Sequence, residues 1–106
     1  MKATLLPAML ACFAASAVFA NTARGDMVEG RHVYVQVCAA CHTNGVAGAP
    51  LYGKRSDWET RLLLGKNQMM RSVLKGKGSM PPKGGNPSVT DAQAAAAMEY
   101  MLAGVK

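Results

Sequence analysis

The chain has 106 residues and a formal net charge of +6, from 12 lysines and arginines against 6 aspartates and glutamates. This length suits one small domain and leaves little apolar side-chain volume for a core. The basic charge is compatible with nucleic-acid binding, but an export signal at the start of the chain removes the usual target. We therefore expect no nucleic-acid partner.

The start of the chain has the organisation of a secretory signal peptide. Lys2 supplies a positive charge, residues 5–19 form an uncharged apolar run, and Val18-Phe19-Ala20 provides the cleavage chemistry. We expect residues 1–20 to be a signal peptide that is cleaved after Ala20, which would place the protein in the periplasm.

Residues 21–106 would then form the mature domain. The apolar run that precedes it is too short and wrongly flanked for a membrane span, so we expect no stable membrane insertion. Two alternatives remain open for this end of the chain: an uncleaved N-terminal anchor, and lipid attachment at Cys12.

The segment Cys38-Ala39-Ala40-Cys41-His42 carries the strongest chemical signal in the sequence. Two thiols at this spacing, followed directly by a histidine, are typical of covalent haem attachment. Each thiol can form a thioether with one vinyl group, and His42 would bind the iron as an axial ligand. The sequence therefore predicts one haem c, with its iron, as the cofactor.

The cysteine pair has two other interpretations. A thioredoxin-like redox pair requires a βαβ context, and the sequence contains no strand-rich stretch. A zinc site requires two further ligands. His32 is the other histidine of the chain, and we expect it to be solvent-exposed. Export also favours haem, because two free thiols in an oxidising compartment would tend to form a disulfide.

Helical patterns account for most of the remaining chain, and no strand or internal repeat is predicted. A capping box of Asp26 and Glu29 would begin the first helix, Asn67 would cap the third, and Thr90 with Gln93 would cap the last. Glycine and proline interrupt the segments between them. The expected helices cover about residues 26–37, 56–64, 68–75 and 91–103.

The first and last helices carry faces that would fit closely together. Gly30 and Tyr34 share one face of the first helix, and Ala96, Tyr100 and Ala103 share one face of the last. A glycine inside a helix costs about 1 kcal/mol relative to alanine. Close approach of the second helix would compensate for that cost.

Two residues near the cysteine–histidine segment are candidates for the haem pocket. A histidine that binds a metal usually donates its other ring N–H to a carbonyl or carboxylate. Pro50 cannot donate a backbone hydrogen bond, but its carbonyl can accept one, so it is our candidate acceptor for His42. Trp58 is the one tryptophan, and either of two roles is open to its indole: a hydrogen bond to a haem propionate, or core packing.

Met80 is the candidate for the second axial ligand. It lies in the segment 77–85, where glycines and prolines predict a loop, so it is not required for an amphipathic helix. A thioether is a good soft ligand for haem iron. The other candidate methionines occupy helical positions that core packing explains: Met69, Met70, Met98 and Met101.

With these residues in place, the chain resembles a class I c-type cytochrome, and more closely the short bacterial cytochrome c5 group. The resemblance covers residues 30–102. It rests on Gly30 with Tyr34, the segment 38–42, Gly45-Val46-Ala47-Gly48-Ala49-Pro50, Trp58, Arg61, Met80-Pro81-Pro82-Lys83-Gly84 and Glu99-Tyr100-Met101.

The resemblance implies an all-α, small class I cytochrome c-like fold, with about four helices wrapped around one covalently attached haem. It also implies crossing N- and C-terminal helices, ligation of the iron by His42 and Met80, and the transfer of single electrons. Arg61 matches a position in the haem pocket of that group.

The sequence departs from the cytochrome c5 pattern at two places. That group usually has a second cysteine pair, joined as a disulfide, just after the methionine loop, where this chain has Asn86-Pro87-Ser88-Val89. The other departure is Leu51-Tyr52, where the pattern has a polar residue and then a leucine. We expect Tyr52 to take the place of that leucine against the haem.

The function predicted from these residues is a soluble periplasmic electron carrier that is a monomer and not an enzyme. Two protein ligands would leave no open iron position for a substrate. Alternatives are a haem subunit of a larger redox complex and a ligand-binding haem sensor in which Met80 dissociates. Basic residues either steer the protein toward redox partners with acidic docking faces or form a solvated surface: Lys54, Arg55, Lys66, Arg71, Lys75, Lys77 and Lys83.

The signal peptide gives the first testable prediction. N-terminal sequencing of the protein purified from its native host is expected to begin at Asn21, because cleavage follows Ala20. A lipid-modified polypeptide beginning at Cys12 would contradict this prediction and indicate a membrane-anchored protein.

Overall fold

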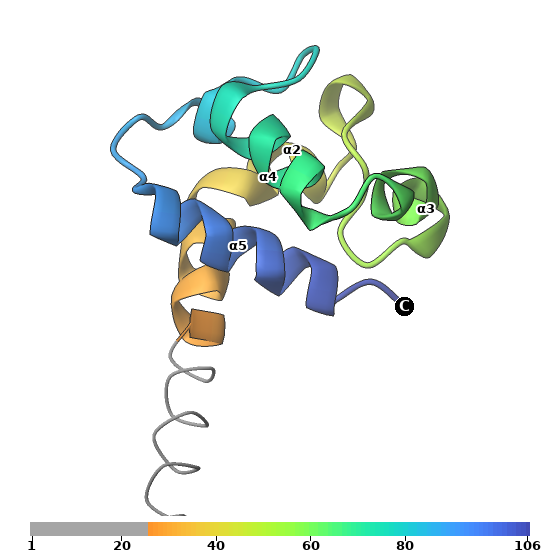
Figure 1. Ribbon diagram of the computed structural model, residues 1–106, viewed down its shortest axis with the longest axis horizontal. Helices are drawn as coiled ribbons and strands as arrows, with labels where there is room; N and C mark the ends of the chain where they lie inside the picture. Colours follow the sequence, from red (N-terminus) through yellow and green to blue (C-terminus); the bar gives the residue numbers. More distant parts are fainter. Residues whose placement is uncertain (1–25) are drawn as a thin grey trace, which may run out of the picture.

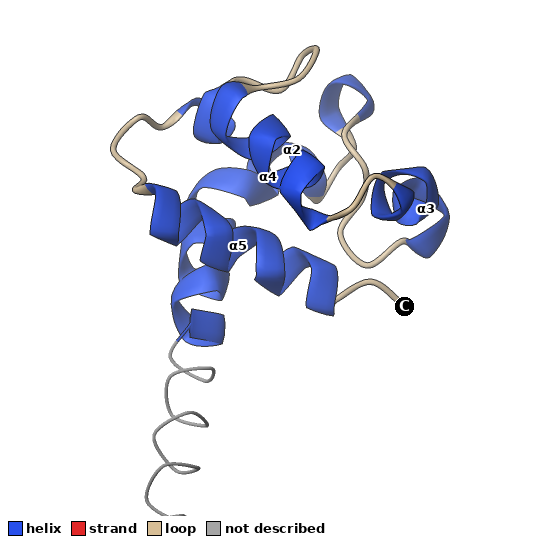
Figure 2. Ribbon diagram, in the orientation of Figure 1, coloured by secondary structure: helices blue, strands red, loops and turns tan. Residues whose placement is uncertain are grey.

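The structure is a computed structural model that describes residues 26–106, and these fold as packed helices and loops (Figure 1). The predicted signal peptide and its cleavage site lie outside the described residues. Between residues 26 and 106 there is no strand, only an isolated backbone bridge that joins Lys77 to Met80 (Figure 2). The predicted all-α class is therefore confirmed. No helix in this range is both long and apolar enough to span a membrane.

The first helix is longer than the sequence predicted. Residues 26–33 are α-helical, a π-helical turn follows at Tyr34–Cys38, and α2 (Ala39–His42) continues it. The helix was predicted to end near Val37, so the whole cysteine–histidine segment lies on helix. The predicted cap at Asp26 is wrong, because Asp26 is already helical.

The other helices lie close to their predicted ranges. They are α3 (Arg55–Leu63), α4 (Lys66–Lys75) and α5 (Asp91–Ala103). Single 3₁₀ turns occur at Val46–Gly48 and Pro82–Gly85. Helix α4 begins two residues early, with Gly65 at its N-cap and no side-chain cap, so the predicted cap at Asn67 is wrong.

The predicted capping box of α5 is present and also joins two helices. Thr90 Oγ1 accepts the backbone N–H of Gln93 at 3.1 Å, and Gln93 Oε1 accepts the backbone N–H of Thr90 at 3.0 Å. The amide nitrogen of Gln93 donates to Glu29 Oε1 at 2.9 Å. Glu29, which was expected to cap its own helix, therefore ties the first helix to the start of α5.

The first helix and α5 cross in direct contact at Gly30 (Figure 1). A Cβ atom at this position would overlap the carbonyl oxygen of Ala96 and lie 3.1 Å from the Cβ of Tyr100. One helical turn further on, the rings of Tyr34 and Tyr100 are 5.4 Å apart. The predicted packing of these two faces is confirmed.

The buried side chains form two clusters and leave space between them. One cluster contains Val33, Val89, Ala94 and Ala97. The other contains Tyr34, Trp58 and Met101. None of the large side chains in the described part of the chain is completely buried. The helices therefore surround an interior that side chains do not fill.

The crossing at Gly30 gives the second prediction. Gly30→Ala is expected to lower the free energy of unfolding by about 1–3 kcal/mol, because overpacking of the contact outweighs the gain in helix propensity. Denaturant unfolding of the purified protein measures this change. Val28→Ala is the matched control, since Val28 is 67% exposed on the same helix and should change stability by less than about 0.5 kcal/mol. Equal stability of the Gly30 variant and the wild type would contradict the close contact.

Candidate functional site

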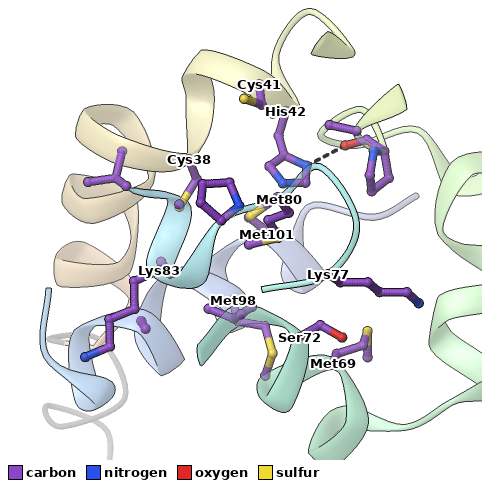
Figure 3. Close-up of a pocket in the computed structure, with 18 of the residues that line it drawn as sticks. Cys38, Cys41, His42, Met69, Ser72, Lys77, Met80, Lys83, Met98 and Met101 are labelled. Atoms are coloured by element: carbon purple, nitrogen blue, oxygen red, sulfur yellow. Dashed lines mark hydrogen bonds between the residues drawn. The ribbon is translucent and has the colours of Figure 1, made fainter. Parts of the chain in front are cut away.

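The unfilled interior is a cavity of about 390 Å³, which is within the size range of small-molecule and cofactor sites. Its lining is mostly apolar and comes from all the helices and from both loops (Figure 3). Most of the site residues predicted from sequence line this one cavity: Cys38, Cys41, His42, Pro50, Trp58, Arg61 and Met80.

His42 is buried and held in one orientation. Its Nδ1 donates to the carbonyl of Pro50 at 2.7 Å, the hydrogen bond that the sequence predicted (Figure 3). A carbonyl can only accept, so Nδ1 carries a proton, and Nε2 is the ring nitrogen that remains for binding a metal. The backbone carbonyl of His42 accepts the N–H of Tyr52 at 2.8 Å, so the loop binds this residue at two points.

The two cysteines lie on the wall of the cavity that carries His42 (Figure 3). Neither forms a disulfide; Cys38 is half-buried and Cys41 is exposed. Burial raises the pKa of the Cys38 thiol, so this sulfur is uncharged at neutral pH. The π-helical turn before Ala39 inserts one extra residue into the helix, since the N–H of Ala39 bonds to the carbonyl of Tyr34. The sequence did not predict that turn.

Met80 is held at the cavity by a tightly constrained loop. Lys77 and Met80 exchange two backbone hydrogen bonds, of 2.9 and 3.0 Å. Gly76 has a φ of 84°, and a Cβ there would lie 2.8 Å from the carbonyl oxygen of Met80 and 3.1 Å from Pro82. Only glycine fits this turn, so the position of the methionine is fixed by the backbone around it.

Three of the four helical methionines are buried, as the sequence predicted, Met70 is half-buried, and the three buried ones also face the cavity. Met69, Met98 and Met101 line it, whereas Met70 is absent from the lining. Figure 3 shows Met69 and Met98 on the wall facing the cysteines. The cavity is therefore rich in thioethers, and Met80 is the one that a loop supplies.

Trp58 and Asp57 fasten α3 to the loop that holds His42. The indole N–H of Trp58 donates to the carbonyl of Leu51 at 2.8 Å, and Asp57 Oδ2 accepts the N–H of Leu51 at 3.0 Å. The indole N–H is thus used within the protein, which favours core packing over the alternative of a propionate hydrogen bond. Arg61 is half-buried at the cavity, with Nη1 donating to the carbonyl of Asp57 at 2.6 Å.

Tyr52, which was expected to lie against the cofactor, packs in this structure against two other tyrosines. Tyr52 does not line the cavity; its ring lies 5.0 Å from Tyr34 and 5.5 Å from Tyr100. The hydrogen bond with Tyr100 raises the pKa of Tyr52 to about 12. The ring also covers Gly104, where a Cβ would lie 2.5 Å from Tyr52 Cζ. Tyr52 thus joins the His42 loop to the C-terminal end of α5.

The charged residues of the cavity are all basic. Arg61, Lys77 and Lys83 line it, and no acidic residue does so in the part of the chain that the structure describes. Sequence reasoning identified Arg61 through the family pattern and treated the two lysines as surface charges. The only sequence signal for their position at the cavity is that each lysine lies three residues from Met80.

The donor set fits a haem of the c type. A cysteine pair and a histidine lie on one wall, the histidine uses Nδ1 for Pro50 and leaves Nε2 for a metal, and a loop thioether is at the same cavity. The surrounding apolar lining would exclude water from a macrocycle. Cys38 and Cys41 would hold this group, with His42 and Met80 as axial ligands.

Comparison with known proteins gives the same family. Residues 25–101 match a protein-family model described as "Cytochrome C oxidase, cbb3-type, subunit III". The chain is 42% identical to cytochrome c-555 of Chlorobaculum thiosulfatiphilum over 81 residues, covering 73% of this chain and 94% of that protein. It is 33% identical to cytochrome c5 of Azotobacter vinelandii, covering 73% of this chain and 95% of that protein.

A solved structure agrees with these matches. A chain from the crystal structure of an electron-transfer complex of nitrite reductase with cytochrome c superposes with a TM-score of 0.69 and 38% identity. The match covers 74% of this chain and 95% of that one. The chain therefore belongs to the family of the matching model and, within it, to the class I c-type cytochromes that resemble cytochrome c5, electron-transfer proteins whose cofactor is covalently attached haem c.

Proposed function

We propose that the protein is a soluble, monomeric, periplasmic electron carrier. One haem would be bound through Cys38 and Cys41, with His42 and Met80 as the axial ligands. The observation that carries the proposal is the buried His42 ring, whose Nδ1 is bonded to Pro50 and whose Nε2 is free for a metal. Haem c supplies one-electron exchange, and the protein controls access and reduction potential.

Each proposed ligand has a support that limits its movement. The bond to Pro50 fixes the tautomer and the ring plane of His42 and increases the basicity of Nε2. Met80 is held by the Lys77 bridge and the close fit of Gly76. A methionine ligand raises the reduction potential relative to a second imidazole. With both positions filled by protein, no iron position remains for a substrate, which supports a carrier rather than an enzyme.

A second candidate is a haem subunit of a larger redox complex. The description of the matching family model favours it, since that description names an oxidase subunit. The lengths of the relatives favour the carrier, because the matches span 94% of a cytochrome c-555 and 95% of a cytochrome c5. Gel filtration of a periplasmic extract separates the two: a carrier elutes at the size of this chain alone.

The charges of the described residues support an acidic docking partner. Four of the seven cations proposed for steering are paired with acids, at distances of 2.9–3.9 Å. The remaining three, Arg71, Lys75 and Lys77, have no ion pair within the described residues and lie on α4 and the turn after it. An unneutralised positive region beside the cavity would attract a negatively charged surface. The solved neighbour is a cytochrome c in complex with nitrite reductase, which supports docking on a redox enzyme.

The attachment of haem gives the third prediction. Intact mass spectrometry under denaturing conditions should give the mass of residues 21–106 plus one haem, because thioether bonds survive unfolding. In a Cys38→Ala, Cys41→Ala variant the haem should be lost on denaturation. A wild-type protein of bare polypeptide mass, made in cells that mature such cytochromes, would contradict the attachment.

The sixth ligand gives the fourth prediction. Met80→Ala is expected to abolish the weak long-wavelength band of methionine-ligated ferric haem, lower the reduction potential and open the iron to added ligands. Absorption spectroscopy and potentiometry measure these changes. Met69→Ala is the control: Met69 is buried at the same cavity, so this variant should lose about 2–5 kcal/mol of stability and keep the band. Rapid binding of carbon monoxide by the wild type at neutral pH would favour the sensor instead.

A further inference from the structure

Lys83 differs from the other ion-paired cations in its burial and in the length of its ion pair. Its Nζ lies 2.9 Å from Asp91 Oδ1, the shortest ion pair in the described residues. The Lys83 side chain is only 21% exposed, whereas that of Asp91 is 75% exposed. Figure 3 shows this side chain directed away from His42, although Lys83 itself lines the cavity. The lysine is therefore unavailable for steering and joins two segments instead.

The backbone at Lys83 is in a conformation that a lysine rarely adopts. Its φ and ψ are 54° and 35°, in the left-handed region, and Gly84 follows with φ 64°. Such a conformation is unfavourable for a residue with a side chain and persists where the surroundings hold it. Gly84 packs against the first helix so closely that a Cβ there would lie 2.9 Å from Val37 Cγ1. The turn is thus pressed onto the helix that carries the cysteines.

The ion pair joins Lys83, in the methionine loop, to the start of α5. The loop runs from residue 76 to residue 90, between the end of α4 and the start of α5. On the α4 side, the Lys77–Met80 bridge holds it. On the α5 side, Lys83–Asp91 is the only ion pair that residues 76–90 form within the described part of the chain. Asp91 is the first residue of α5, so the loop is tied to a rigid element.

We propose that the Lys83–Asp91 ion pair is a positioning contact that keeps the methionine loop closed and thereby sets how readily Met80 leaves the iron. The inference rests on the proposed axial role of Met80. Lys83, three residues after the methionine, would thus control how fast the sixth ligand exchanges.

The two partners allow a test that separates this role from a simple effect of charge. Lys83→Gln removes a positive charge and Asp91→Asn removes a negative one, so their electrostatic effects on the haem are opposite in sign. If the contact itself matters, both variants should loosen the loop in the same direction. Lys66→Gln is the matched control, since Lys66 pairs with Glu99 at 3.1 Å across α4 and α5 but touches no part of the loop.

The experiment measures the rate at which imidazole binds to the ferric holoprotein, at one fixed pH above the pKa of free imidazole so that the ligand is uncharged. Lys83→Gln and Asp91→Asn should each raise this rate about three- to fivefold, the effect of removing one partly exposed ion pair. The double variant should be no faster than either single variant. Lys66→Gln should match the wild type. An unchanged rate in Asp91→Asn, or an equal increase in Lys66→Gln, would overturn the proposal.

Amide hydrogen exchange provides a readout that does not depend on the iron. The N–H groups of Lys77, Met80 and Gly84 are bonded within the loop, so they should exchange faster in both variants while the amides of α5 remain protected. Uniformly faster exchange throughout the protein would overturn the local role. A wild-type spectrum without methionine ligation would refute the axial assignment of Met80, and the exchange experiment would still decide whether the ion pair closes the loop.

Discussion

The hydrogen bond from His42 Nδ1 to the carbonyl of Pro50 is the interaction on which the rest of the site depends. Proline has no N–H, so residue 50 offers its neighbour an acceptor and nothing else. To bring residue 50 beside residue 42, the chain must turn back sharply, and it does so through left-handed backbone at Gly45 (φ 74°) and Ala47 (φ 52°). The glycines of this loop thus permit the turn that orients the His42 ring.

The same ring is connected to the far end of the molecule through a single continuous helix. His42 ends the helix that crosses α5 at Gly30, and Glu29 bonds to the capping residue Gln93 beside that crossing. A rotation of the helix would move the cysteines and the histidine together. The crossing of the first helix and α5 therefore sets the direction from which the cofactor is held, although it lies outside the cavity.

Local patterns predicted the parts of this structure that local chemistry decides. The Thr90–Gln93 capping box, the Gly30 contact and the Pro50 acceptor each follow from short spacings or from the size of one residue. The direction in which a side chain points could not be predicted in this way, because it depends on neighbours that are distant in sequence. Tyr52 turned toward Tyr34 and Tyr100, and the Trp58 indole found the carbonyl of Leu51. Neither the π-helical turn nor the Lys83–Asp91 pair has a sequence signature that would have revealed it.

The volume of the cavity has a consequence for how the protein is made. The cavity walls are mostly apolar side chains, which lose contact with one another if nothing fills the space between them. A chain of this size has few other buried side chains to compensate for that loss. The polypeptide alone therefore has little thermodynamic reason to stay in this shape. Folding and loading of the prosthetic group are therefore coupled, and the amount of folded protein in a cell is expected to follow the supply of that group.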